Sequence, residues 1–200
     1  MKLVADPETN TLPKLLRRNA QTWPRHPGMR EKDRGIWETF TWRQCQAHVR
    51  DFALGLAALG FKRGDKLSVL GDNRAQLYWA QISAQALGGM AVPLYQDSIA
   101  SELAHVLTHA EVSVVAAEDQ EQVDKVLSLR DQLPNLRWVL YEDPRGMGGY
   151  REKFLKSIAE VEAAGRDFGK AHPDYYDSEV GKGGAEDVAL IGRASCRERV

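Results

Sequence analysis

Residues 60–117 constrain the fold of this chain more than any other stretch, because short strand patterns alternate there with helical ones. Asn73 and Gln76 have the spacing of a capping box at the start of the first helix, and Gly88-Gly89 would end it. Strands and helices that alternate in this way predict a largely parallel, wound sheet flanked by helices, and therefore the α/β class. The apolar runs that have the length of buried strands lie at residues 66–70, 91–95 and 112–116.

The segment before this stretch predicts a helix, a hairpin and a second helix. Two short strands at 29–32 and 36–41 would form the hairpin. Thr41 and Gln44 have the spacing of a second capping box, at the start of a helix that Gly60 ends. The first helix is expected at 11–23, with these residues toward the core: Leu12, Leu15, Leu16 and Trp23.

The segment after this stretch predicts one more strand and two more helices. A helix at 120–133 and a strand at 137–141 continue the alternation. Residues 166–187 are polar and are interpreted as a linker, and 187–191 have the pattern of the start of a buried strand. The last helix would end near Gly165 and pack through Phe154, Leu155, Ile158 and Val161.

Composition excludes several classes of protein. A net charge of −1 gives no reason to expect a polyanionic partner, so nucleic acid is disfavoured. No apolar run approaches the roughly 20 residues of a membrane span, and the N-terminal residues lack the apolar core of a secretory signal. Two cysteines are too few for a disulfide framework, which predicts a cytoplasmic protein.

Two loops at the ends of expected strands are candidate binding sites. The turn 71–74 places backbone N–H groups at a helix start, but it lacks both common glycine-rich phosphate patterns, so a capped helix is the favoured interpretation. Tyr95, Gln96 and Asp97 follow the next strand at its carboxyl end, where open parallel sheets bind ligands, and form a candidate pocket rim. The alternative, which we favour, is that Asp97 or Ser98 only caps the following helix.

Three other residue patterns are interpreted as structural. His105 and His109 have the spacing of a two-histidine metal site, but no third ligand is near, so we expect no metal there. Cys45 lies on an apolar helical stripe and is expected to be a packed core thiol. Lys182 among glycines lacks the spacing of a phosphate loop and is assigned to the linker.

Taken in order, several segments resemble bacterial long-chain fatty acyl-CoA synthetases of the adenylate-forming, AMP-binding superfamily. The resemblance covers nearly all of residues 8–191. The segments that carry it are Arg30-Glu31-Lys32-Asp33, Gly35-Ile36-Trp37, Thr41-Trp42, Leu54-Gly55-Leu56-Ala57-Ala58-Leu59-Gly60, Lys62-Arg63-Gly64-Asp65, Gly71-Asp72-Asn73-Arg74, Gln85-Ala86-Leu87-Gly88-Gly89, Val92-Pro93-Leu94-Tyr95-Gln96-Asp97 and Glu118-Asp119-Gln120-Glu121-Gln122-Val123-Asp124-Lys125.

This resemblance implies a two-step ligase that uses ATP and Mg²⁺. A fatty acid and ATP give an acyl-adenylate and pyrophosphate, and the thiol of CoA then displaces AMP. In the family a strand like 187–191 precedes a phosphate loop of the type Tyr-Thr-Ser-Gly-Thr-Thr-Gly-x-Pro-Lys-Gly, which this chain lacks. We therefore expect no catalytic, cofactor-binding or metal-binding residue in the chain itself, and no tight binding of ATP.

The end of the chain has a different origin in this interpretation. Residues 192–200 match the in-frame translation of a common sequencing adapter, and Ile191 fits either side of the junction. The expected organisation is therefore an N-terminal part of the AMP-binding domain at 1–191 and a foreign tail at 192–200. We expect an inactive fragment that self-associates, from a cytoplasmic enzyme for which a peripheral position at the inner membrane surface stays open.

Two alternatives from other classes remain open from the sequence. One is a nucleotide-binding α/β module that is not a ligase, against which the absence of a Gly-x-Gly-x-x-Gly turn counts. The other is a non-catalytic interaction domain, which would be a closed monomer.

Overall fold

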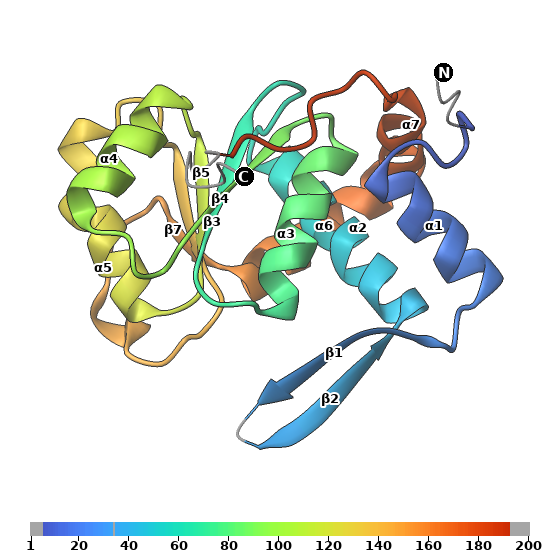
Figure 1. The fold of residues 1–200 in the computed structure, drawn as a ribbon, viewed down its shortest axis with the longest axis horizontal. Coiled ribbons are helices and arrows are strands. Elements are labelled where there is room, and N and C mark those ends of the chain that lie inside the picture. The colour runs from blue at the N-terminus through green and yellow to red at the C-terminus, as the bar shows by residue number, and fades with distance from the viewer. Residues whose placement is uncertain (1–5, 34, 193–200) are drawn as a thin grey trace, which may run out of the picture.

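The computed structural model describes residues 6–33 and 35–192, and a parallel sheet lies at the centre of this part of the chain (Figure 1). The five strands follow the order β4-β3-β5-β6-β7, and every neighbouring pair is parallel. This arrangement confirms the α/β class. The strands are β3 (Lys66–Leu70), β4 (Met90–Leu94), β5 (Val114–Ala117), β6 (Trp138–Tyr141) and β7 (Leu155–Ser157).

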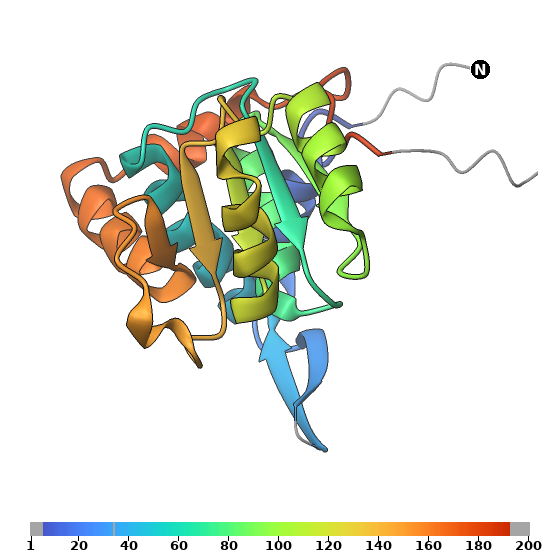
Figure 2. The same ribbon diagram turned by 90° about the vertical axis from the view of Figure 1, so that its left-hand side faces the viewer.

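Helices cover both faces of the sheet (Figures 1 and 2). One face carries α4 (Ala100–His109) and α5 (Gln120–Ser128). The other face carries α2 (Trp42–Ala58), α3 (Ala75–Ala86) and α6 (Ile158–Ala171). Outside these helices lie α1 (Leu12–Thr22) and α7 (Tyr175–Lys182), so the helical side is two layers deep.

The strands are apolar on both sides because each side faces a separate core. In β3, Leu67 and Val69 join the core with α2 and α3, whereas Leu70 joins the core with α4 and α5. The buried hydroxyl of Ser68 donates to the carbonyl of Val92 at 2.8 Å, which satisfies the one buried polar side chain of this strand.

Two glycines set the distance between α2 and α6. A Cβ at Gly165 would lie 1.8 Å from the Asp51 carbonyl oxygen, and one at Gly55 would lie 2.1 Å from the Val161 carbonyl oxygen. No side chain fits at such distances, so the two helix backbones pack directly against each other. The sequence pattern predicted both helices but gave no sign of this contact.

An antiparallel hairpin projects from the body of the molecule (Figure 1). It consists of β1 (Pro27–Asp33) and β2 (Ile36–Thr41), with Glu31 opposite Glu38 and Lys32 opposite Trp37. The capping box of Thr41 and Gln44 at the start of α2 is confirmed. The N-terminal helix is also confirmed, but Leu12 and Trp23 are 52% and 45% exposed, so their predicted core positions are wrong.

The predicted cap of α3 is wrong. Arg74, not Asn73, is the N-cap residue, and its side chain makes no capping hydrogen bond. The carboxylate of Glu31 from β1 accepts from the Ala75 backbone N–H at 2.7 Å instead. Asn73 accepts from the Tyr78 hydroxyl at 3.0 Å, because the turn directs its side chain away from the helix start.

The segment after β6 also differs from the prediction. Residues 155–157 form β7 rather than the first turn of a helix, and Ser157 with Glu160 makes the capping box that starts α6. The predicted linker is wrong because α6 continues to Ala171 and α7 follows with Tyr176 fully buried. Short 3-10 turns occupy Arg130–Gln132, where a longer α5 was predicted, and Met147–Gly149.

Only one bridge forms in the predicted strand at 187–191. Leu190 pairs in parallel with Ala91 on the outer edge of β4, while Val188 is 58% exposed. Pro93 lies on this edge strand, where the lack of a backbone N–H is tolerated. No helix in the described ranges has the length and apolarity that crossing a membrane requires.

Candidate functional site

The carboxyl ends of β3 and β5 form the switch point of the sheet. The loop after β3 leads to α3 on one face, and the loop after β5 leads to α5 on the opposite face. Neighbouring strands whose connections diverge in this way leave a crevice where open α/β sheets usually bind ligands. The contents of this crevice therefore decide what the described chain can bind.

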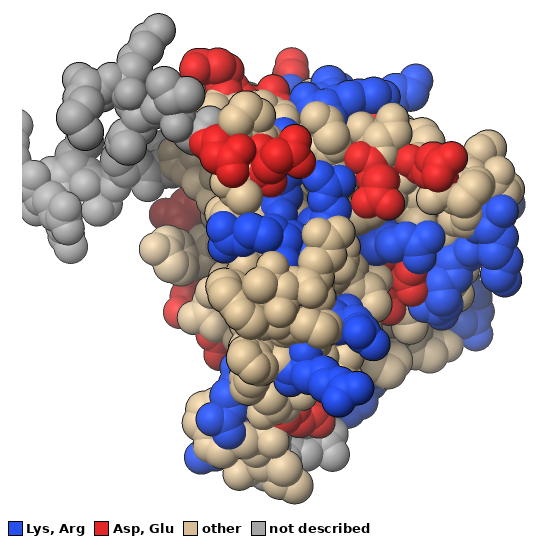
Figure 3. Space-filling view, turned by 90° about the vertical axis from the view of Figure 1, so that its right-hand side faces the viewer, with Lys and Arg blue, Asp and Glu red and all other residues tan. Residues whose placement is uncertain are grey.

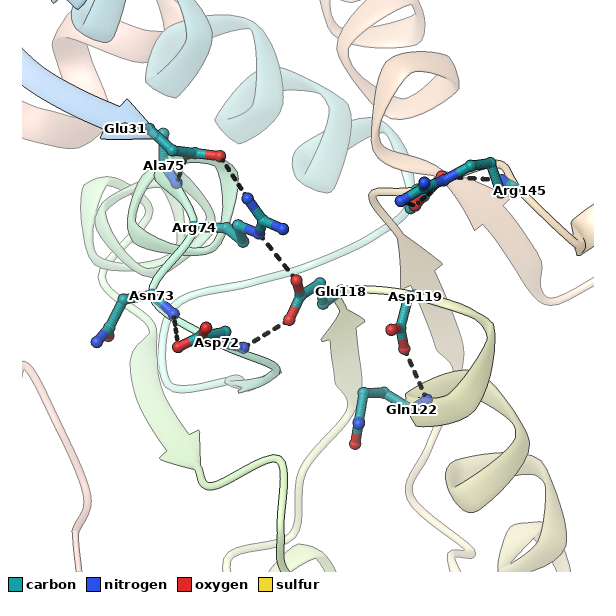
Figure 4. Close-up of polar contacts among 10 residues, drawn as sticks. Glu31, Asp72, Asn73, Arg74, Ala75, Glu118, Asp119, Gln122 and Arg145 are labelled. Atoms are coloured by element: carbon teal, nitrogen blue, oxygen red, sulfur yellow. Dashed lines mark hydrogen bonds and ion pairs between the residues drawn. The ribbon is translucent and has the colours of Figure 1, made fainter. Parts of the chain in front are cut away.

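Arg74 occupies the crevice and joins two carboxylates (Figure 4). Its Nε donates to Glu118 Oε1 at 2.8 Å and its second donor group contacts Glu31 Oε1 at 3.0 Å. The other oxygen of Glu118 accepts from the Asp72 backbone N–H at 2.6 Å. Hydrogen bonding to Glu118, followed by that to Glu31, holds the pKa of Arg74 above its usual value.

Acidic residues after β6 complete this cluster. Glu142 lies beside the Arg74 network, and burial, followed by the charge of Glu31, raises its pKa to about 7. Its Oε2 is buried without a hydrogen-bond partner. Asp143 pairs with Arg145, and Asp119 after β5 caps α5 by accepting from the Gln122 N–H at 3.1 Å (Figure 4).

The cluster fills the position that an anionic ligand would take. The N-terminus of a helix attracts anions, and at α3 the carboxylate of Glu31 already binds the free N–H group of Ala75. Glu118 binds the N–H of the preceding turn in the same way. The favoured interpretation of turn 71–74 as a helix start without a bound phosphate agrees with this geometry, although the capping residue comes from the hairpin.

A cleft of about 1210 Å³ opens beside the edge strand β4. Its floor comes from the strands, and its walls come from α3 and α4. Most of its lining is apolar, and Tyr78, Tyr95 and the two α4 histidines add polar atoms. Apolar residues of the lining include Val69, Leu77, Val92, Leu94, Leu103 and Ile191.

The structure separates the three candidate rim residues. Tyr95 lines the cleft and is 85% exposed, while Gln96 and Asp97 form a turn outside the lining. The carbonyl of Gln96 accepts from Lys125 Nζ at 2.7 Å. The favoured capping role is wrong, because Ile99 is the N-cap of α4 and no side chain caps that helix.

The histidines and the cysteine in this part of the chain form neither a metal site nor a reactive thiol site. The rings of His105 and His109 stack at 5.8 Å along the cleft wall. Within the described ranges no group of three or more His, Cys, Asp or Glu residues could hold a metal ion. Cys45 is buried in the core, and burial raises the pKa of its thiol, which disfavours the reactive thiolate.

Comparison with protein families decides the identity of this architecture. The sequence profile of AMP-binding enzymes matches residues 16–191, which is most of the chain. The chain belongs to the AMP-binding enzyme family. This membership makes it part of the adenylate-forming ligase family.

Named relatives of this AMP-binding chain are acyl-CoA ligases. A Xenopus laevis long-chain-fatty-acid–CoA ligase, ACSBG2, is 28% identical over 134 residues, which are 66% of this chain and 18% of that protein. The Mycobacterium bovis long-chain-fatty-acid–CoA ligase FadD15 is 31% identical over 106 residues, which are 53% of this chain and 18% of that protein. The chain thus spans about a fifth of the length of these relatives.

Solved structures agree on the fold. A Mycobacterium tuberculosis fatty acyl CoA synthetase superposes with a TM-score of 0.66, covering 95% of this chain and 34% of that one. Its sequence identity is 18%, so the likeness shows the shared architecture alone.

Sequence reasoning missed the residues that fill the switch crevice. Glu31 lies on a separate hairpin, and nothing in the spacing along the chain places it beside Arg74. A weaker signal was present: acidic pairs follow two strands, at Glu118-Asp119 and Glu142-Asp143. Carboxyl ends of parallel strands meet at one edge of a sheet, so these pairs could have been expected to meet there.

Proposed function

We propose that residues 1–191 are the N-terminal part of the AMP-binding domain of a long-chain fatty acid–CoA ligase. The observation that carries the proposal is the family match over 16–191, together with relatives that are named as such ligases. The proposal adds two claims to membership of the family. The substrate is a long-chain fatty acid, and this chain is the N-terminal part of the domain.

The whole enzyme would activate a fatty acid in two steps. The fatty acid carboxylate attacks the α-phosphate of ATP, which gives an acyl-adenylate and releases pyrophosphate. The CoA thiol then attacks the acyl carbon, and AMP leaves. ATP and Mg²⁺ belong to the whole enzyme in this account: ATP supplies the adenylyl group, and Mg²⁺ with basic side chains would offset the phosphate charge.

The described residues do not form the ATP site, so no catalytic role is assigned to them. Glu31 and Glu118 occupy the free N–H groups at the switch crevice, and two carboxylates there would repel a phosphate. In this account the residues of the cluster hold the loops at the sheet edge in place. The 200-residue chain on its own is therefore proposed to be inactive.

The segment at 187–191 leads toward the site that the proposal requires. Leu190 runs parallel to β4, and the Ile191 N–H donates to the Ala91 carbonyl at 2.8 Å. The next residues, Ile191 and Gly192, reach the cleft. Residues 193–200, which form most of the proposed foreign tail, lie outside the described residues.

The coding sequence of the source genome tests this proposal directly. Downstream of codon 191 we expect a Ser/Thr/Gly-rich loop that ends in Pro-Lys-Gly. A continuation without such a loop would refute the proposed position of this chain in the domain, and a genome that encodes residues 192–200 as printed would refute the foreign tail. With the full-length enzyme, acyl-CoA formation should be faster with long-chain than with short-chain or aromatic acids, and the reverse order would refute the substrate.

Self-association of the 200-residue chain is part of the proposal. Leu190 beside the edge strand, Tyr95 at the cleft and Ile99 at the start of α4 are all exposed, and such apolar surface promotes association. Size-exclusion chromatography should show oligomers that dissociate on dilution. A monodisperse monomer would favour a closed interaction domain instead. The cytoplasm is the proposed location.

A further inference from the structure

The projecting hairpin has two chemically different faces. Side chains alternate along a strand, so each face takes every second residue. On the inner face Met29 and Phe40 pack against the core, and Glu31 binds Arg74. The opposite face is called the outer face here, and it consists of four exposed residues: Arg30, Lys32, Trp37 and Thr39.

The contacts of the outer face hold its side chains together. The Arg30 guanidinium lies 5.4 Å from the centre of the Trp37 ring and donates from Nε to the Thr39 hydroxyl at 3.2 Å. Lys32 lies opposite Trp37 in the strand register. These neighbours orient the Trp37 ring, yet it remains 59% exposed.

The charge on the outer face has a single sign. Both of its ionisable residues are cations, and its described side chains include no carboxylate. Glu31 and Glu38 pair with each other on the inner face, and alternation along β1 assigns position 33, which pairs with Ile36, to the same set. Figure 3 shows the hairpin at the bottom of the view, where Lys, Arg and uncharged atoms make up most of the visible surface.

We propose that the outer face of the hairpin binds the surface of an anionic lipid bilayer. Tryptophan prefers the membrane–water interface, where its ring is buried among headgroups and its N–H remains hydrated. Arginine and lysine beside it bind lipid phosphates and are attracted by the negative surface potential.

Other partners fit this face less well. A nucleic acid would need a longer track of cations than two side chains, and the chain as a whole has a net charge of −1. The inference goes beyond the proposed function, although it agrees with it, because long-chain fatty acids partition into bilayers. Binding to lipid does not require ligase activity, so the two claims can fail separately.

Sedimentation with lipid vesicles tests the proposal, in the absence of ATP, CoA and fatty acid. The 200-residue chain and the full-length enzyme should both bind vesicles that contain phosphatidylglycerol. Binding to phosphatidylcholine alone should be much weaker, and high salt should release the protein. Arg30→Gln with Lys32→Gln should lower the partition coefficient by about 25-fold, since each cation contributes about fivefold. Trp37→Ser should lower it by roughly tenfold or more.

Matched variants elsewhere on the surface serve as controls. Lys62→Gln with Lys153→Gln removes two exposed cations, and Tyr95→Ser removes an exposed aromatic ring. Their binding should change by less than about twofold. Circular dichroism verifies the folding of each variant. Brominated lipids supply a second measurement, because they should quench fluorescence in the unaltered chain and quench it less after Trp37→Phe.

Three results would overturn the proposal. The first is equal binding to neutral and anionic vesicles. The second is an equal loss of binding in the hairpin variants and the control variants. The third is a full-length enzyme that does not bind the anionic vesicles and whose β1 and β2 amides are strongly protected from hydrogen exchange. In that case another part of the protein would cover the outer face.

Discussion

Glu142 gives the sharpest prediction about stability, because its carboxyl group is held in an unfavourable place. Burial is the larger cause of its raised pKa, and the charge of Glu31 adds to it, against the opposing effect of Arg74. Glu118 and Asp143 also repel the ionised form. Replacing the carboxyl group by an amide, Glu142→Gln, removes the charge while keeping the size of the side chain.

The size and sign of the effect follow from the two pKa values. The folded-state pKa of about 7 lies above the ordinary value of 4.5, so the folded protein holds a proton that the unfolded chain has already lost. The free energy of unfolding therefore falls as the pH rises from 4.5 to about 7 and levels off above it. At about 1.4 kcal/mol for each pKa unit the loss is at most about 3 kcal/mol, and partial exposure of Glu142 reduces it to about 1–3 kcal/mol.

Urea denaturation at about pH 5 and about pH 8 measures this loss. Near the lower pH, Glu142→Gln and the unaltered chain should differ by less than about 1 kcal/mol. Near the higher pH the variant should be more stable by about 1–3 kcal/mol. Glu186→Gln at an exposed position should show no such pH-dependent difference. A difference between Glu142→Gln and the unaltered chain that is the same at both pH values would refute the reasoning.

Three further predictions concern packing and anchoring, each measured as a change in the free energy of unfolding. Gly165→Ala should cost about 1–3 kcal/mol, because its methyl group would overlap a backbone carbonyl of α2. Gly181→Ala in α7 meets no neighbour within 4 Å and should stabilise by about 0.5–1 kcal/mol, so equal effects of the two variants would refute the close helix contact. Glu31→Gln should cost about 1–3 kcal/mol and speed hydrogen exchange at the start of α3, because Glu31 binds Arg74 and the Ala75 N–H. Glu38→Gln on the neighbouring strand should be nearly neutral, and the opposite ranking would contradict the role of Glu31 in anchoring α3. Lys14→Met should cost about 1–3 kcal/mol, because the buried Lys14 ammonium donates to the carbonyl oxygens of Pro7 and Gly183 at 2.7 Å each. An unchanged free energy of unfolding would show that these two hydrogen bonds contribute nothing.

The parallel sheet could be predicted because its signals are local. Apolar runs of strand length, glycines at helix ends and the Thr41–Gln44 capping box each depend on residues close together in the chain. The capping box of Ser157 and Glu160 was equally visible, but the apolar pattern through Phe154 and Leu155 favoured one continuous helix. A strand of three residues has too little pattern to compete with it.

The contents of the switch crevice could not be predicted, since they depend on contacts between distant segments. Arg74 and Glu31 are 43 residues apart, and Glu118 is 44 residues beyond Arg74. The sequence shows three charged residues, whereas the fold makes them one network that fills an anion site. The candidate rim was predicted from strand ends alone, which explains why Tyr95 lines the cleft while Gln96 and Asp97 turn away.

Palmitate-dependent exchange of labelled pyrophosphate into ATP tests the central claim most directly, because it reports formation of the acyl-adenylate. The full-length enzyme should catalyse the exchange faster with a long-chain fatty acid than with shorter or aromatic acids, and the 200-residue chain should give no signal above background. Exchange by the 200-residue chain would contradict the view that the described residues are a scaffold without the ATP site. A full-length enzyme that exchanges with other carboxylic acids but not with palmitate would contradict the proposed substrate.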